Sequence, residues 1–233
     1  MEYKILNFPI TMPFGNTENS VYPTLLLDKH NIILVDCGFI GSLSILQKEL
    51  LRHGMSAEQI TGLVLTHHDH DHMGAAAALK RINPNIKIYA SAVEAPFISA
   101  QEKPLRLRQA EEMQKTLQPE QQDFGKAFCD MLRRVEPVEV DIFLSDGDRM
   151  DWCEGCSILA TPGHTPGHIS LLIEKDSIII TGDVIALEDG KPVIANPQFT
   201  LDLEQATRSM EKVLLMKAKT YYCYHGGVYY PAG

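Results

Sequence analysis

Long apolar runs are missing from this chain. No segment approaches the roughly 18 consecutive apolar residues that a membrane-spanning helix requires. The first nine residues also lack the features of an export signal, a basic start followed by an apolar stretch and a small-residue cleavage site. The sequence therefore predicts no membrane association and a cytoplasmic location.

Positive charge is scarce as well. The chain carries 21 lysines and arginines against 30 aspartates and glutamates, which gives a formal net charge of −9. Because proteins that bind nucleic acid normally present a basic face, we predict no nucleic-acid partner. A small anionic substrate remains compatible with this charge, since a local site can meet it.

Cysteine is also limited. Five cysteines at irregular spacing, an odd number, do not form the framework of a secreted disulfide-rich protein. Reduced thiols are therefore expected. Cys153 and Cys156 have CxxC spacing, but no second pair completes a zinc ribbon, so we interpret them as a chance pair near a turn.

What is present fits an ordinary globular protein. The chain has 233 residues, of which 45% are hydrophobic and 22% charged, enough for a sizeable core. Apolar periodicity and turn residues predict helices over 42–53, 74–83 and 203–218. They predict strands over 3–8, 24–28, 32–36, 62–66, 86–90, 138–144, 157–161, 169–174, 177–181 and 220–224.

The segment from about 93 to 135 differs in character. It is rich in charged and amide residues, with apolar residues at helical spacing, and about forty residues make a poor independent core. We interpret it as a helical insertion. Its arginines are expected on solvated helix faces, with contact to a substrate anion as the alternative: Arg106, Arg108, Arg133 and Arg134.

The run from His67 to His72 is the most informative stretch. It lies between the apolar strand at 62–66 and a helix that starts near Gly74, so it occupies a strand-to-helix turn. Imidazole and carboxylate are the usual protein ligands of zinc, iron and manganese, and a turn can direct several of them at one point. By itself the run is equally compatible with a chance polar loop.

Three further motifs also follow strand ends. The Pro- and Gly-rich loop from Pro162 to Gly167 displays His164, Asp183 follows Gly182, and His225 follows the strand at 220–224. Sheets with helices on their faces usually build their sites where strands give way to loops.

Together these pieces resemble the metallo-β-lactamase-fold superfamily. Its signature is H-x-H-x-D-H, a histidine in a P-G-H-T-x-G loop, an aspartate after G-D and a final histidine, and the Asp36-Cys37-Gly38 turn resembles the family's early aspartate-glycine turn. The resemblance covers essentially the whole chain. It implies an α/β fold, a four-layer αββα sandwich forming one domain over 1–233, with the insertion at 93–135 and metals at one sheet edge.

The resemblance also implies the roles of individual residues. His67, position 69 and His164 would hold one metal ion, Asp71, His72 and His225 a second, and Asp183 would bridge them. Two divalent ions about 3.5–4 Å apart can share a hydroxide and polarise a substrate. Asp71 is the predicted catalytic residue, orienting that nucleophile, and zinc is the first choice of metal.

Position 69 departs from the commoner pattern, because this chain has aspartate where histidine is usual. A carboxylate is a harder ligand, so manganese or iron become alternatives. Another alternative is that His68 or His70 binds in its place, although each is one residue out of register. The simpler interpretation has His68, His70 and His168 flanking the site, facing ligands or solvent.

The predicted function is a dinuclear metal-dependent hydrolase. Its partner would be a small molecule, an ester, lactone, thioester or phosphodiester, selected by the insertion acting as a lid. One alternative is an iron-dependent oxidoreductase or dioxygenase, which Asp69 favours. The other is a metal-binding module without catalysis. No oligomeric state follows from the sequence.

Overall fold

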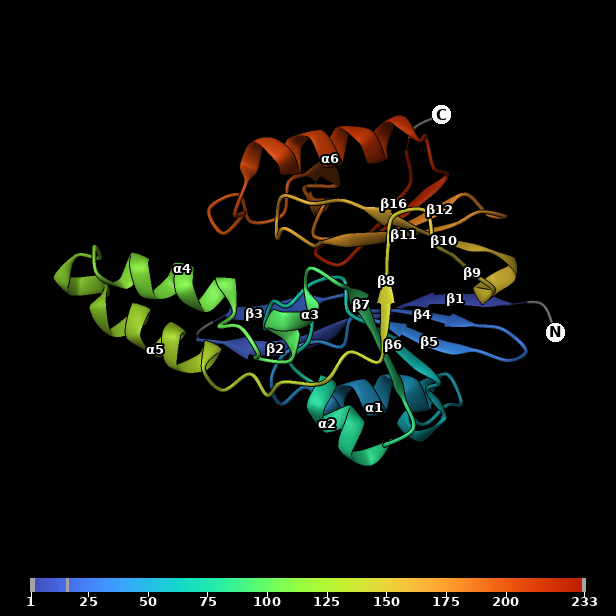
Figure 1. Cartoon of the computed structure of the whole chain (residues 1–233), viewed down its shortest axis with the longest axis horizontal. Coiled ribbons are helices and arrows are strands. Elements are labelled where there is room, and N and C mark those ends of the chain that lie inside the picture. Colours follow the sequence, from blue (N-terminus) through green and yellow to red (C-terminus); the bar gives the residue numbers. More distant parts are fainter. Residues whose placement is uncertain (1–2, 16, 232–233) are drawn as a thin grey trace.

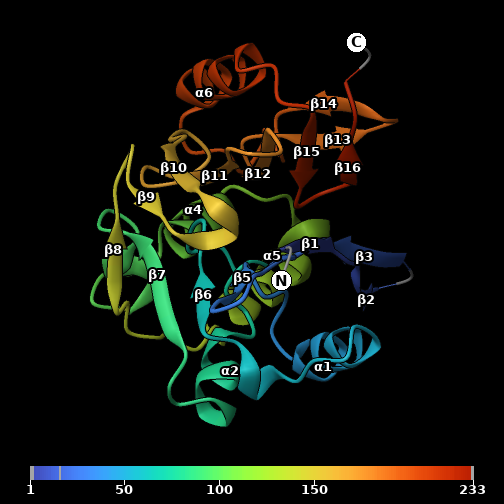
Figure 2. The ribbon, with the colours of Figure 1, turned by 90° about the vertical axis from the view of Figure 1, so that its right-hand side faces the viewer.

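Two six-stranded β-sheets lie face to face in the computed structural model, which describes residues 3–15 and 17–231. Helices α1 (Leu43–Arg52) and α2 (Ala76–Ile82) cover the outer face of one sheet, and α6 (Leu203–Leu215) covers the other (Figure 1). Turning the molecule by 90° keeps α6 and the α1/α2 pair on opposite sides (Figure 2). The predicted αββα sandwich is thus confirmed.

The first sheet has a parallel half. Its order is β1 (Lys4–Asn7), β4 (Thr24–Leu27), β5 (Ile32–Val35), β6 (Gly62–Val64), β7 (Lys87–Ser91) and β8 (Ile142–Leu144). Strands β4 and β5, both predicted from the sequence, form an antiparallel hairpin, and the pairs from β5 to β8 are all parallel. The carboxyl ends of β5 and β6 therefore reach the same sheet edge.

The second sheet is mostly antiparallel. Its order is β16 (Gly227–Tyr229), β15 (Thr220–Cys223), β12 (Ile178–Gly182), β11 (Ile169–Ile173), β10 (Cys156–Ala160) and β9 (Arg149–Met150). Only β12 and β15 pair in parallel, with Gly182 opposite Cys223. Asp183 and His225 consequently leave the sheet at neighbouring positions.

Apolar side chains fill the space between the sheets. Leu26, Ile33 and Val64 from the first sheet and Leu171 from the second belong to one buried cluster with Trp152, the only tryptophan. Burying each such side chain contributes about 1.5–3 kcal/mol relative to leaving it exposed. This core fixes the two sheets against each other and so fixes the edge where the sequence motifs end.

The helical segment predicted at 93–135 contains α3 (Ala95–Ile98), α4 (Leu105–Gln114), a short 3-10 helix (Pro119–Gln121) and α5 (Gln122–Leu132). Helices α4 and α5 pack on each other through a small buried cluster that includes Leu107 and Leu132. They project from one side of the sandwich (Figure 1). In the part of the chain that the structure describes, no helix is long and apolar enough to cross a membrane.

Several short elements were not predicted. Two hairpins, β2 (Ile10–Phe14) with β3 (Thr17–Val21) and β13 (Ala186–Glu188) with β14 (Lys191–Val193), stand apart from the main sheets. Strands β9 and β16 were also missed. Strands this short, with a polar sequence such as Thr17-Glu18-Asn19-Ser20, lack the apolar alternation that would reveal them.

The smaller turn elements follow local signals more closely. The Ser56-Ala57-Glu58-Gln59 sequence forms a capping box, with Gln59 accepting from the Ser56 backbone N–H at 2.8 Å, and it starts the 3-10 helix Ala57–Gln59. A further 3-10 turn spans Trp152–Glu154. All five cysteines are free and buried, in line with reduced thiols.

Candidate metal centre

Loops from both sheets converge on one point at the sheet edge. The loop after β6 supplies four of the predicted side chains, and the loops after β10, β12 and β15 supply one each. Their ligand atoms form three overlapping groups, each within 4.8 Å: His67, Asp69 and His164; His67, His72 and Asp183; Asp71, His72 and His225. The structure therefore brings together all seven residues that the sequence singled out.

The cluster has two sides, and Asp183 lies between them. The first side is made of His67, Asp69 and His164, and the second of Asp71, His72 and His225. The Asp183 Oδ1 atom is 3.1 Å from His72 Nε2 and 3.3 Å from His225 Nε2, while its Oδ2 atom is 3.3 Å from His164 Nε2. Burial would raise the pKa of this carboxyl, but His225, His72 and His164 hold it well below its usual range. One carboxylate thus faces His164 of the first group and both histidines of the third.

Four buried atoms in the cluster make no hydrogen bond of good geometry, although Asp183 Oδ1 lies within 3.3 Å of two of the others: His67 Nε2, His72 Nε2, Asp183 Oδ1 and His225 Nε2. Buried polar atoms are nearly always paired, so four unpaired ligand atoms around one point are unusual in a purely structural network. Imidazole nitrogen and carboxylate oxygen are also the donors that zinc, manganese and iron accept. The donor set fits divalent metal ions.

Asp36 orients part of this cluster. It accepts hydrogen bonds from the backbone N–H and the hydroxyl of Thr66 at 2.9 and 2.8 Å, and its Oδ2 atom lies 2.8 Å from His72 Nδ1. With Nδ1 engaged by a carboxylate, the Nε2 atom of His72 faces the site. The early aspartate-glycine turn was noted in the sequence, but this contact was not predicted.

Tyr224 holds the backbone of the His67–His72 loop at Asp71. Its hydroxyl donates to the backbone carbonyl of Asp71 at 2.5 Å and accepts from the Gly38 N–H at 3.0 Å. The residue is buried beside His225 and was missed in the sequence, where it looks like an ordinary strand tyrosine. It ties the turn after β5 to the loop after β6.

His168 lies beside the cluster and supports Asp183. Its Nε2 atom accepts the Asp183 backbone N–H at 2.9 Å, so Nδ1 carries the proton and faces the Thr161 hydroxyl at 2.8 Å. Burial, with the neighbouring His164, lowers its pKa to about 3, which keeps the ring neutral.

His68 corrects the sequence-based interpretation. Its ring is buried and turned away from the cluster, with Nδ1 bonded to Glu94 and Nε2 accepting the Leu105 N–H at 3.2 Å. Neither metal binding in place of Asp69 nor exposure to solvent is therefore right for His68. The partner, Glu94, was not recognised in the sequence.

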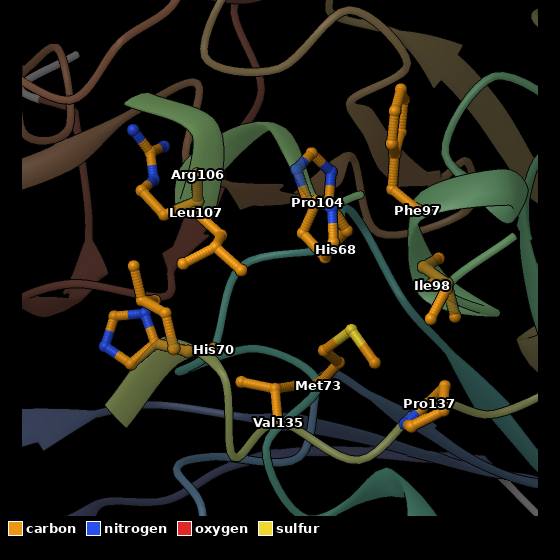
Figure 3. A pocket seen from close by; sticks show the side chains of 12 residues that line it. His68, His70, Met73, Phe97, Ile98, Pro104, Arg106, Leu107, Val135 and Pro137 are labelled. Atoms are coloured by element: carbon orange, nitrogen blue, oxygen red, sulfur yellow. The ribbon is translucent and has the colours of Figure 1, made fainter. Parts of the chain in front are cut away.

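His70 is also outside the three groups. It lies in the wall of an apolar chamber with Met73, Leu107 and Val135 (Figure 3). Its Nδ1 atom is 3.5 Å from Asp71 Oδ1, too far for a good hydrogen bond.

Arg106 is the largest surprise at the site. It is only 3% exposed, and its Nη2 atom lies 2.6 Å from Asp69 Oδ2 and 3.2 Å from His164 Nε2. The expectation of a solvated helix face is wrong for this residue, whereas Arg108, Arg133 and Arg134 are exposed as expected. The reason is that the start of α4 docks on the loop after β6.

The contact with Arg106 changes the electrostatics of Asp69, the position where the family pattern usually has histidine. Burial would raise the pKa of Asp69, but the Arg106 guanidinium, together with His164 and His67, holds it well below its usual range. Asp69 is therefore an anion, as a metal ligand or an arginine partner must be.

A cavity of about 360 Å³ opens over the cluster. Its floor includes Asp69, Asp71, His164, Asp183 and His225. Its walls carry aromatic and amide side chains, some from α5 and some from the 196–199 segment, together with one imidazole and one guanidinium: Phe124, Phe128, Phe199, Asn19, Asn196, Gln198, His70 and Arg106.

The sequence model described as the metallo-beta-lactamase superfamily matches residues 16–225. The chain belongs to this superfamily. Among its curated relatives, the probable metallo-hydrolase YflN of Bacillus subtilis is 27% identical over 221 residues, covering 89% of this chain and 80% of the relative. The probable metallo-hydrolase MJ0888 of Methanocaldococcus jannaschii is 28% identical over 172 residues, covering 74% and 69%.

Solved structures show the same superfamily fold. The family protein TTHA1429 from Thermus thermophilus superimposes with a TM-score of 0.76 at 20% identity, over 97% of this chain and 74% of that one. The archaeal superfamily protein ST1585 from Sulfolobus tokodaii gives 0.67 at 19% identity, over 91% and 76%. The predicted superfamily is confirmed.

Proposed function

We propose that this protein is a metal-dependent hydrolase that uses two divalent ions. The proposal rests on one observation above all, the convergence of seven ligand-type side chains, four of them with unpaired buried atoms, beneath an open cavity. Relatives named probable metallo-hydrolases support the same interpretation.

The ligand assignment follows the three groups. His67, Asp69 and His164 would hold the first ion, Asp71, His72 and His225 the second, and Asp183 both. Bound ions would supply a water of lowered pKa as nucleophile and polarise the substrate oxygen. Zinc is the first candidate, while the harder carboxylate of Asp69 makes manganese and iron alternatives.

Asp71 is the proposed catalytic residue beyond its role as a ligand. It borders the cavity, its Oδ2 atom is 3.5 Å from His225 Nε2, and Tyr224 fixes its backbone. A carboxylate held in this way can orient the attacking water and take up its proton.

The cavity suggests the kind of substrate. About 360 Å³ suits a small molecule, with an apolar part against the phenylalanines and polar atoms near Asn19 and Asn196. We propose a small ester, lactone, thioester or phosphodiester. Helix α5, which contributes Phe124 and Phe128, would act as part of the lid.

Iron-dependent oxidation is the second candidate, favoured by the carboxylate at position 69. It predicts iron in the purified protein and substrate-dependent oxygen consumption. The hydrolase predicts zinc or manganese and no oxygen uptake.

The test begins with chelator-treated protein reloaded with zinc, manganese or iron and assayed against the four substrate classes. Hydrolysis should require metal, and Asp71→Asn should lower kcat at least about 100-fold. Asp151→Asn makes the same change at an exposed position after β9 and serves as the matched control. Turnover that survives complete metal removal would refute the proposal.

A further inference from the structure

The two sides of the cluster differ in what their ligand atoms contact. On the second side, His72 Nε2, His225 Nε2 and Asp183 Oδ1 make no hydrogen bond of good geometry, and the Asp183 oxygen faces the two nitrogens at 3.1 and 3.3 Å. On the first side only His67 Nε2 makes none, because Arg106 contacts both Asp69 and His164.

The contact with His164 uses the atom that a metal would need. A guanidinium can only donate, so where Arg106 donates to Nε2 it takes the single lone pair of that nitrogen. If Nε2 instead carries the proton and donates to Asp69 Oδ2, which lies 3.1 Å away, it has no lone pair to offer. In either tautomer His164 cannot bind a metal while this arrangement persists.

The positive charge of Arg106 also opposes metal binding on the first side. The Arg106 side chain is buried, and a guanidinium keeps its proton in proteins. A divalent ion on His67, Asp69 and His164 would be close to that positive charge, and like charges in a partly buried site repel each other more strongly than they do in bulk water. Within the described residues, no lysine or arginine forms an ion pair with Asp71 or Asp183.

Arg106 is held in place from outside the cluster as well. It donates to the Phe199 carbonyl and the Gln109 side chain, and its guanidinium lies 5.5 Å from the Phe199 ring centroid. The next residue back, Leu105, bonds to His68. Displacing the guanidinium therefore disturbs the cavity wall and the start of α4.

We propose that Arg106 and the first metal ion exclude each other. One ion then binds tightly at Asp71, His72 and His225, and a second binds only when Arg106 withdraws from Asp69 and His164. The inference rests on the proposed metal ligands but not on any hydrolytic activity. It makes an arginine of the lid the residue that sets how many ions the site holds.

The test is a calorimetric titration of metal-free protein with zinc ions, with zinc counted by elemental analysis. Wild type should show two classes of site whose Kd values differ at least about tenfold. Arg106→Gln should tighten the weak class about tenfold or more, while Arg108→Gln, an exposed arginine on the same helix, leaves both classes unchanged. His225→Ala should abolish the tight class and His67→Ala the weak one.

Two results would overturn the inference. One is a wild-type protein that binds both ions with indistinguishable affinity, a result that needs no variant to fold. The other is a weak class that Arg106→Gln, shown by thermal unfolding to be folded, leaves unchanged or weakens further. Failure of hydrolysis alongside the expected titration would count against the proposed activity alone.

Discussion

Glu94 is a single buried carboxylate that holds two loops of this site together. Its side chain is 0% exposed, its Oε2 atom bonds to the ring and the backbone N–H of His68, and its Oε1 atom accepts the Gly167 N–H at 2.7 Å. It thereby joins the loop after β6 to the loop that carries His164.

Replacing this carboxylate should destabilise the protein. Glu94→Gln leaves His68 without its anionic partner in a buried setting, and we expect a loss of about 2–3 kcal/mol in the free energy of unfolding. Urea unfolding of both proteins measures it. Glu102→Gln, at an exposed glutamate, should change stability by less than about 0.5 kcal/mol. Equal stability of wild type and Glu94→Gln would show that this network is not needed for folding.

The same pair of proteins gives a pH prediction. Burial opposes ionisation of Glu94, but His68 and hydrogen bonds from Thr165 and Gly167 hold its pKa below the usual 4.5. A lowered pKa means that the stabilisation is complete above about pH 4.5 and declines as the pH falls through the folded value. The stability difference between metal-free wild type and Glu94→Gln should therefore shrink as the pH falls below 4.5. A difference that grows on acidification would contradict this assignment.

Among the elements, the turn between β6 and α2 depends on one close approach. A Cβ atom at Gly74 would lie 2.3 Å from the Ile40 backbone nitrogen and 2.4 Å from the His70 carbonyl oxygen. Backbone atoms cannot move aside as a side-chain end can, so Gly74 permits the loop carrying Asp71 and His72 to pack here.

Gly74→Ala should accordingly cost about 3 kcal/mol of stability and weaken metal binding, because the loop must shift. Gly54→Ala is the matched control, since a Cβ atom there meets nothing within 4 Å and only the positive φ of 75° is strained. That change should cost about 1 kcal/mol and leave metal binding intact. Thermal unfolding and elemental analysis report the two effects, and similar losses in both variants would argue against a steric role.

Helix α5 gives the lid prediction. Phe124 borders the cavity yet is 63% exposed, so it contributes little to the core. Phe124→Ala should raise KM about tenfold for substrates with a bulky apolar group, with kcat nearly unchanged. Leu215→Ala, at a 76% exposed position on α6, should leave both constants unchanged. A short linker in place of 105–132 that preserves the substrate range would contradict the lid assignment.

At the scale of the whole molecule, the cluster joins the two sheets. The loop after β6 belongs to the first sheet, and the loops bearing His164, Asp183 and His225 belong to the second. An ion bound there would bridge both layers of the sandwich, so its binding energy should oppose global unfolding rather than local opening alone.

Zinc at about 100 times its Kd should then add about 2.7 kcal/mol of stability, raising Tm by about 5–10 °C, and chelation should reverse the gain. Fluorescence of Trp152, buried between the sheets, follows this transition. Asp183→Asn should lose most of the zinc-induced shift. A wild-type Tm that is the same with and without zinc would mean that metal does not link the sheets.

The sequence by itself determined much of this protein. Apolar alternation located the main strands, helical spacing located α1, α2 and α6, and the motif residues marked the strand ends where the cluster forms. These features are readable because they depend on local patterning and on residues whose chemistry has few other uses, such as His67 and Asp71 in one turn.

Only the tertiary structure decided which partners the buried polar groups have. His68 meets Glu94 across 26 residues, and Asp69 meets Arg106 across 37, and neither pairing has a local signature. Arg106 looks like any helix-surface arginine until α4 docks on the loop after β6. A buried charge takes the partner that packing places beside it, and packing between distant segments is set by the assembled layers rather than by neighbours in the chain.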